Sequence, residues 1–168
     1  MSMDAHLDLN KGNIKGESKH HGHTDHIQLQ SWSWGVSNTG SHAGGTGGGG
    51  AGKSHFQDFH FTMHMSKASP LLFLACATGQ HIPEATLVVR KAGQLGEQQK
   101  FLIIKFTDLM ISSYQSGGHE GADSLPVEQI SFNYSKLEFE YHGQDKDGKT
   151  SKALGATAGF DLKTHKKV

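Results

Sequence analysis

Apolar and polar side chains alternate with a period of two residues through much of this chain, and that period predicts β-strands. Within residues 5–9 and 55–65, apolar side chains recur at every second position. Residues 86–91 form a short run rich in β-branched residues. Residues 100–114 are largely apolar and are expected to form a long strand. The pattern therefore predicts a mainly β fold. The apolar face of the first two strands is expected to comprise Ala5, Leu7, Leu9, Phe59, Phe61, Met63 and Met65.

The alternation changes phase in two stretches. In residues 127–141 the change falls at Ser135–Lys136, and in residues 27–34 it falls between Leu29 and Trp32. A phase change moves the apolar side chains to the other face of a strand, unless a β-bulge inserts an extra residue and bends the strand. Two interpretations stay open at each place: a bent, bulged strand that helps to curl the sheet into a barrel, or two short strands joined at the change.

One segment has the signals of a helix. Ser69 is a suitable N-cap, Pro70 suits the first turn, and Gly79 suits the position after the last turn. Residues 71–78 between them are mostly apolar, so we expect a short helix that packs against the sheet or plugs it. Cys76 within it is expected to be a small buried apolar residue rather than a nucleophile.

Length and charge narrow the class of protein. The 168 residues predict a single domain over 1–168. The 16 Lys and Arg balance the 16 Asp and Glu, which argues against a nucleic-acid partner. One cysteine rules out an internal disulfide framework. The longest apolar run, 71–77, is too short to insert into a membrane, and no basic-then-apolar leader opens the sequence. We expect a protein that stays in the cytoplasm or leaves it without a cleaved signal peptide.

Glycine is concentrated in one place. Of 22 glycines, eight lie between Gly40 and Gly52, inside an expected extended loop over 36–53. A loop of that length in a compact domain is usually functional or disordered. Other loops are expected at 11–26, 116–124 and 143–156.

Residues 47–54 of the glycine-rich loop match the phosphate-binding pattern G-x-x-x-x-G-K-[ST]. A working site of that kind needs a strand before it and a helix after it, whose amides hold the phosphates. The residues before it do not read as a strand, and those after it alternate as a strand. We therefore judge nucleotide binding at 47–54 unlikely. The sequence contains no catalytic constellation and indicates no cofactor.

Histidine and tryptophan offer two weaker candidates. His20, His21, His23 and His26 cluster in a loop, and imidazole is the commonest metal ligand near neutral pH. Their spacing alone does not define a zinc site, so they are only weak metal-binding candidates. Trp32 and Trp34 should point to the same side, as core or interface anchors or as a stacking platform for a ligand. A small-ligand or metal-binding β-barrel is the alternative function.

At SWSWGVSN, residues 31–38, the chain resembles the Hcp family, the haemolysin-coregulated tube proteins of bacterial type VI secretion. The resemblance extends over nearly the whole chain. It departs from the family pattern in the dense histidines of 20–26 and at Ser66, where an acidic residue is expected. The blocks that carry it are GESKHHGHTDHIQLQSWSWGVSN (16–38), GAGKSHFQDFHFT (50–62), KASPLLFLACATG (67–79), EATLVVRKAG (84–93), FLIIKFTDLMISSYQSGG (101–118), VEQISFNYSKLEFEY (127–141) and GFDLKT (159–164).

The resemblance implies a curled β-barrel of two antiparallel sheets with one short helix, and a ring-shaped homohexamer. It implies that rings stack into a tube inside a contractile sheath, beneath a spike protein. It further implies that the lumen carries effector proteins, and that the protein is assembled in the bacterial cytoplasm and then secreted. The polar strand faces, such as Ser131, Asn133 and Ser135, would suit either a wet lumen or an outer wall. By resemblance, loop 36–53 reaches a neighbouring subunit or ring through Val36, Asn38, Ser41, His42 and Lys53.

Overall fold

The computed structural model describes residues 3–40, 52–92, 98–121 and 125–168. The described part consists of strands, one α-helix and a short 3-10 helix. In chain order they are β1 (Asp4–Asp8), η1 (Asn10–Gly12), β2 (Ile27–Leu29), β3 (Ser31–Ser33), β4 (Val36–Asn38), β5 (Ser54–Phe56), β6 (Phe59–His64), α1 (Ser69–Thr78), β7 (His81–Ala92), β8 (Gln98–Gln115), β9 (Val127–Gln144), β10 (Thr150–Asp161) and β11 (Lys166–Lys167).

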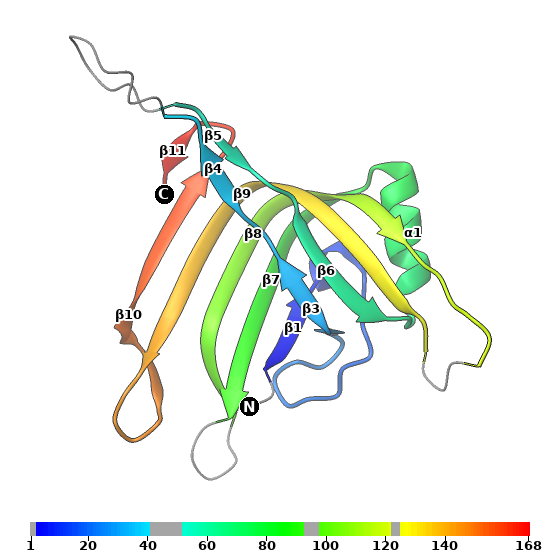
Figure 1. Cartoon of the computed structure of the whole chain (residues 1–168), viewed down its shortest axis with the longest axis horizontal. Helices are drawn as coiled ribbons and strands as arrows, with labels where there is room; N and C mark the ends of the chain where they lie inside the picture. Colours follow the sequence, from blue (N-terminus) through cyan, green and yellow to red (C-terminus); the bar gives the residue numbers. More distant parts are fainter. Residues whose placement is uncertain (1–2, 41–51, 93–97, 122–124) are drawn as a thin grey trace.

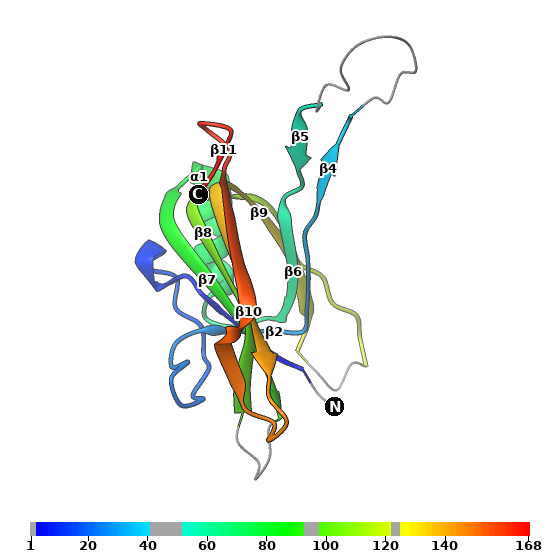
Figure 2. The ribbon, with the colours of Figure 1, turned by 90° about the vertical axis from the view of Figure 1, so that its left-hand side faces the viewer.

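The strands form two antiparallel sheets, as the resemblance implies. The larger sheet has the order β11-β10-β9-β8-β7-β1-β2, and β6 joins it by pairing with both β9 and β3. The smaller sheet is the hairpin of β4 and β5, which projects away from the larger one (Figure 2). The larger sheet curls strongly, but its hydrogen-bonded order ends at β11 and β2, so the barrel is not closed (Figure 1).

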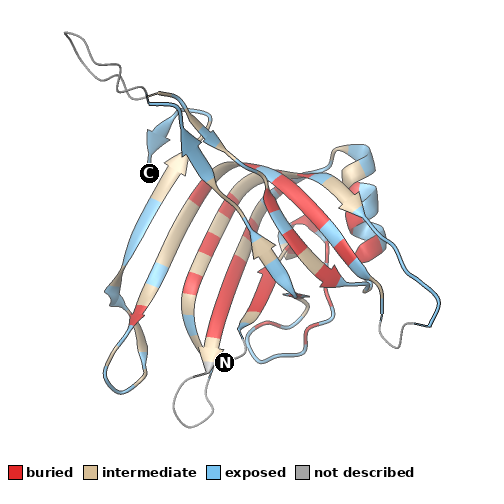
Figure 3. Ribbon diagram, in the orientation of Figure 1, coloured by how far each residue is buried: buried red, intermediate tan, exposed pale blue. Residues whose placement is uncertain are grey.

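A cluster of aromatic rings fills the inside of the curl. The ring centroids of Phe59, Phe106 and Phe132 lie 5.0 Å from one another, and each side chain is fully buried. These rings come from β6, β8 and β9, so the alternating apolar positions of three strands meet at one point. Buried residues run in bands across these strands (Figure 3). Burial of rings of this size is the main source of stability for such a fold.

Two positions depart from the predicted alternation. Met65 lies beyond the end of β6 and is partly exposed, so the prediction that it belongs to the apolar face is wrong. His6 is expected on the polar face of its strand but is fully buried. Residues 13–26 fold back over that face of β1 and bring His23 against the His6 ring. The first strand is therefore covered on both faces.

The phase change at Ser135–Lys136 does not interrupt β9, so neither a bulge nor a break occurs at that point. The compensating irregularity lies across from it on β8, where Asp108 has a φ of 53°. The Ser135 hydroxyl donates to the Asp108 carbonyl at 3.1 Å. The register of the β8–β9 pair shifts between Ile111 and Ser113. The register is the same on both sides of Asp108, so the two strands change phase together at this point and the register shift lies further along β8.

The phase change in 27–34 is a real break between two short strands. β2 pairs with β1, whereas β3 pairs with β6. Gln30 lies between them, and its backbone N–H donates to the backbone carbonyl of Thr62 at 2.9 Å. The second of the two open interpretations is correct at this place, because each half of the segment meets a different partner strand.

Helix α1 packs against β8 and agrees with the predicted span, apart from its first turn. Pro70 lies in that turn, and Gly79 ends the helix with a φ of 65°, both as predicted. The N-cap is Ala68, however, so the capping role given to Ser69 is wrong. Ser69 is inside the helix, and its hydroxyl donates to the buried carboxylate of Glu128.

The C-terminal strand is longer than the sequence indicates. The expected loop 143–156 shrinks to a turn at 145–149, closed by a 2.8 Å bond from the Asp145 amide to the Lys149 carbonyl. β10 follows at once, although its outward side chains are mostly exposed and its apolar alternation is weak. Gly155 lies directly against the backbone of Tyr141, where any Cβ would collide. Glycines that look like loop residues thus permit close strand packing.

Candidate functional site

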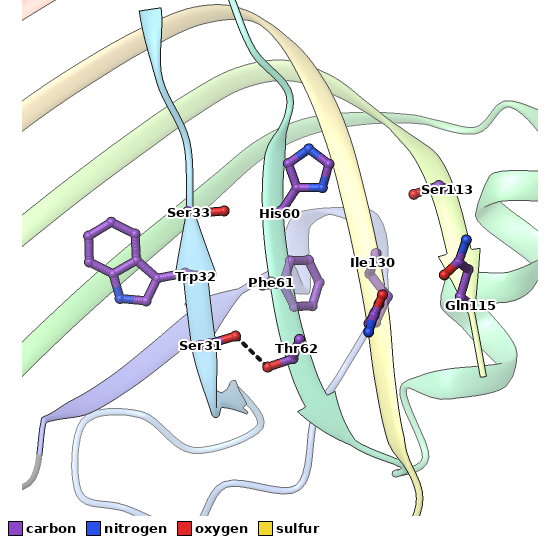
Figure 4. Close-up of a pocket in the computed structure, with 10 residues that line it drawn as sticks. Ser31, Trp32, Ser33, His60, Phe61, Thr62, Ser113, Gln115 and Ile130 are labelled. Carbon is purple, nitrogen blue, oxygen red and sulfur yellow. Dashed lines mark hydrogen bonds between the residues drawn. The ribbon is translucent and has the colours of Figure 1, made fainter. Parts of the chain in front are cut away.

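Two cross-strand rows of polar side chains cover one face of the sheet, where β3, β6, β9 and the end of β8 lie side by side (Figure 4). The strand registers align four residues in each row, because side chains at paired positions point to the same face. The first row is Ser31, Thr62, Gln129 and Gln115, and the second row is Ser33, His60, Ser131 and Ser113. We call these eight residues the polar face.

Hydroxyl groups connect neighbouring strands across the polar face. Ser31 and Thr62 share a hydrogen bond of 2.6 Å, and Ser131 bonds with Ser113 at 2.5 Å. Ser112 bonds with Ser131 at 2.8 Å and donates to the carboxylate of Asp58 at 2.7 Å. Because the eight residues are hydroxyl, amide and imidazole groups, the face has no side chain that is permanently charged. Asp58 adds a carboxylate beside it.

A groove of about 490 Å³ lies on this face. Its lining includes Phe61 and Ile130, which are otherwise buried in the core. Ser33, His60 and Gln129 are exposed and supply polar groups to the groove. Hydroxyl and amide groups both donate and accept hydrogen bonds and carry no net charge, so this concave surface does not favour a ligand of one sign of charge.

Helix α1 presents a different surface, which is apolar. Leu71, Phe73 and Leu74 are all exposed, with 57% of Phe73 and 53% of Leu74 accessible. Met65 and Leu125, near the end of β6 and the start of β9, are also exposed apolar residues. A helix that is apolar on its outward side as well as its inward side is normally covered by another element or subunit. We call Leu71, Phe73 and Leu74 the apolar helix face.

A buried carboxylate fixes this helix to the sheet. Glu128 on β9 is fully buried and accepts hydrogen bonds from the hydroxyls of Ser69 on α1 and Tyr114 on β8. Burial and the hydrogen bond to Glu128 raise the pKa of Tyr114, which therefore stays a donor at neutral pH. The Tyr114 ring meets Phe73 edge-on, with centroids 6.2 Å apart. The position of the apolar helix face thus depends on a buried polar contact.

The two tryptophans pack against the core. The Trp32 ring stacks on Phe59 with centroids 6.4 Å apart, and Trp34 lies against Phe139 at 5.8 Å. Trp32 lies beside the groove, but its indole Nε1 is buried and has no hydrogen-bond partner among the described residues.

The predicted inter-subunit residues fall on the projecting hairpin and beyond it. Val36 and Asn38 are exposed on β4, and Lys53 is exposed just before β5. The expected loop 36–53 therefore begins as a strand, because residues 36–38 pair with 54–56. Ser41 and His42 lie outside the described residues.

The phosphate-binding interpretation does not gain support. Residues 47–51 lie outside the described part of the chain, and strand β5 begins at Ser54. The motif requires the first turn of a helix at that point.

The four clustered histidines separate into different environments. His21 is exposed, whereas His23 is buried. The Nδ1 atoms of His23 and His26 are 3.2 Å apart, and His26 Nε2 is 3.4 Å from a carboxylate oxygen of Asp8. His20 instead approaches the first strand. The four imidazoles therefore do not converge on one point.

His20 joins two residues that the sequence did not connect with it. One oxygen of Asp4 and one ring nitrogen each of His6 and His20 lie within 4.8 Å of one another, a set that could ligate a metal ion. A guanidinium nitrogen of Arg90 lies among them, however. It donates to Asp4 and is 3.1 Å from His20 Nδ1 and 3.3 Å from His6 Nε2. Because this cation already neutralises the carboxylate, we assign no metal to the cluster.

Comparison with solved structures defines the class of protein. The structure of a type six secretion system protein matches with a TM-score of 0.89 and 32% identity, covering 99% of this chain and 100% of that one. Hcp1 from Salmonella typhimurium matches with a TM-score of 0.76 and 29% identity, covering 99% of this chain and 100% of that one. The fold is therefore that of a type VI secretion protein.

Sequence comparison gives the family. The family model described as "Type VI secretion system effector, Hcp" matches residues 6–141. Protein hcp1 of Pseudomonas aeruginosa is 42% identical over 149 residues, which cover 88% of each chain. The chain belongs to the Hcp family, the tube proteins of type VI secretion. In the described part, no helix is both long enough and apolar enough to cross a membrane.

Proposed function

We propose that this protein is the subunit of a hexameric ring, and that its apolar helix face and its polar face have different roles in that ring. Rings require head-to-tail contacts in which one surface of a subunit meets a different surface of the next. The observation that carries the proposal is the apolar helix face, since an outward Phe73 and Leu74 are costly in water unless a neighbour covers them.

Open strand edges support the same arrangement. Among the described residues, β3 pairs only with β6, and β8 beyond Met110 pairs only with β9. These two edges lie at opposite ends of the polar rows. Unpaired edges invite uncontrolled association, and a closed ring protects them by burying them between subunits. Phe73 and Tyr114 lie beside the β8 edge, so the apolar helix face would be buried by the same contact.

The polar face is proposed to line the channel and to meet the effector proteins that it carries. Water can satisfy the hydrogen bonds of its hydroxyl and amide groups when the channel is empty. Cargo proteins differ in charge, and a face without fixed charges does not select strongly for one sign. The balance of 16 basic and 16 acidic residues over the whole chain agrees with this role.

The projecting β4–β5 hairpin is proposed to contact a neighbouring subunit or the next ring. It stands away from the larger sheet (Figure 2), and 52% of Val36 is exposed on it. Stacked rings would form a tube inside a contractile sheath, beneath a spike protein. The tube would be assembled in the bacterial cytoplasm and exported without a cleaved signal peptide. We propose no enzymatic activity for it.

Mass and shape in solution test the proposal. Light scattering during gel filtration is expected to give about six times the 18.2 kDa of one chain, and negative-stain images are expected to show rings with an open centre. A chain that stays monomeric at high concentration would overturn it.

A further inference from the structure

A cluster of buried imidazoles holds the N-terminal segment against β7. His6 on β1 is fully buried, and its ring stacks on that of His23 with centroids 4.7 Å apart and planes 14° apart. His23 is only 3% exposed. The His20 ring lies 4.9 Å from His6, and Arg90 reaches the group from β7. Residues 4–29 are therefore joined to the rest of the sheet partly through aromatic rings that can take up protons.

The hydrogen bonds of this cluster are incomplete. A single nitrogen of Arg90, with two hydrogens, faces acceptor atoms on Asp4, His6 and His20. His6 Nδ1 and Arg90 Nε are buried and have no hydrogen-bond partner within the described ranges. A neutral His6 can turn its Nε2 lone pair toward the guanidinium, but a protonated His6 presents hydrogens on both nitrogens. Protonation therefore replaces an attraction to Arg90 with repulsion between two cations, and the 2.9 Å contact of His6 Nε2 with Asp4 Oδ1 offsets this only in part.

Cations and carboxylates both lie around the stacked rings. His6 faces Asp4 on its own strand, Arg90 on β7, and His20 and His23 on the segment that covers β1. His23 faces His6 and His26 and feels the charges of Arg90 and of Lys100 on β8. Two carboxylates are nearby. Asp4 accepts from Arg90 through Oδ2 and has Oδ1 2.9 Å from His6 Nε2, whereas Asp8 lies 3.4 Å from His26 Nε2.

The titration of the two imidazoles agrees with this geometry. Burial, then the charges of His6 and Arg90, lower the pKa of His23 to about 4. Burial also lowers the pKa of His6, although Asp4 acts in the opposite direction. Burial opposes the ionisation of Asp4, but Arg90 and His6 lower its pKa overall, so the carboxylate remains charged.

We infer that the His6–His23 stack is an acid-operated latch, which releases residues 4–29 from β7 when its imidazoles take up protons. Release would expose the edge of β7 that β1 now covers, since β1 pairs with β7 from Asp4 to Asp8. An acidic environment would then loosen the subunit at its N-terminal strand first. This inference does not depend on ring formation, because every group in the latch belongs to one chain.

The pH range follows from the direction of the shift. An imidazole whose pKa is lower in the folded protein binds fewer protons there than in the unfolded chain, so stability falls as the pH drops below about 6.5. The loss is complete near pH 4, the folded value of His23. From His23 alone, the folding equilibrium constant should fall about 30-fold between pH 7.5 and pH 5.0.

Denaturation of the whole protein at these two pH values, at one protein concentration, tests the latch. The wild type is compared with His23→Phe, which keeps a stacking ring but cannot take a proton. His23→Gln is the second variant if the phenylalanine disturbs folding. His21→Gln is the matched control, since His21 is exposed two residues away. Hydrogen exchange, expressed as protection factors, is followed separately in residues 4–9 and 130–141.

The latch predicts that the folding equilibrium constant of the wild type and of His21→Gln falls between pH 7.5 and pH 5.0. In His23→Phe or His23→Gln this fall should be about 30-fold smaller. It also predicts that protection in residues 4–9 is lost at a higher pH than protection in 130–141. Equal pH dependence in all four proteins would overturn the inference. Simultaneous loss of protection in the two regions would also overturn it, because the whole fold would then open at once.

Discussion

The polar face and the apolar helix face are close in space but chemically opposite. The polar face carries hydroxyl, amide and imidazole groups from four strands, whereas α1 turns Leu71, Phe73 and Leu74 outward. β8 links them, since Gln115 belongs to a polar row and the adjacent Tyr114 contacts Phe73. Adjacent residues of one strand thus point to opposite faces of the sheet, which have different chemical character. One surface tolerates water, and the other requires a protein neighbour.

Placing a carboxylate on each face gives the largest expected contrast. Phe73→Asp puts a charge where the neighbouring subunit is proposed to pack, and a charge buried without a partner costs several kcal/mol. Gel filtration with light scattering should show the variant as a monomer. Ser33→Asp adds the same charge to the polar face and should leave the ring intact. If Ser33→Asp dissociates the ring and Phe73→Asp does not, the two assignments are reversed.

Removal of the buried carboxylate under α1 should have the next largest effect. Glu128→Ala leaves the hydroxyls of Ser69 and Tyr114 without their acceptor. Each unsatisfied buried group costs about 1–3 kcal/mol, so we expect a loss of about 2–4 kcal/mol in the free energy of unfolding. Urea denaturation at fixed protein concentration measures it. Glu138→Ala on the same strand, which removes a carboxylate that is more exposed, should change stability by less than about 1 kcal/mol. Equal effects of the two substitutions would show that Glu128 does not anchor the helix.

The end of α1 allows a smaller test. Gly79 adopts a φ of 65°, which a side chain with a Cβ disfavours. Gly79→Ala should lower the free energy of unfolding by about 1–2 kcal/mol in thermal or urea denaturation. Gly117→Ala is the control, because a Cβ there meets nothing within 4 Å. A Gly79→Ala variant as stable as Gly117→Ala would mean that the helix ends differently in solution.

Stability should respond least to changes on the polar face. Ser33 is exposed, so Ser33→Asp is expected to alter the free energy of unfolding by no more than about 0.5 kcal/mol. Thermal denaturation of the variant and the wild type measures this difference. A loss of several kcal/mol would show that the face is part of the folding core and not a free surface.

The sequence predicts the features that depend on neighbouring residues. Alternation identifies the core side chains Phe59 and Phe61, and Pro70 and Gly79 place the ends of α1. These signals are local, so they survive without knowledge of strand pairing. The first half of β10 is not predicted, because its alternation is weak and its glycines serve close packing against β9.

The sequence does not predict which distant residues share a surface. Ser33, His60, Ser113 and Ser131 form one row only because three strand registers align them. In the same way, the histidines of 20–26 gave a weak metal signal, and nothing in their spacing pointed to His6 or Arg90. Arg90 is 70 residues from His20 and 84 residues from His6 along the chain. Knowledge of the strand registers, or of residue positions that co-vary among related sequences, would reveal such partners.

An electron-microscopy reconstruction of the assembled ring tests the central claim most directly. The account predicts that α1 of each subunit lies against the next subunit, with Phe73 buried in the contact, and that Ser33 and His60 face the central channel. A reconstruction with α1 exposed on the outer surface, or with the polar face turned away from the channel, would contradict it.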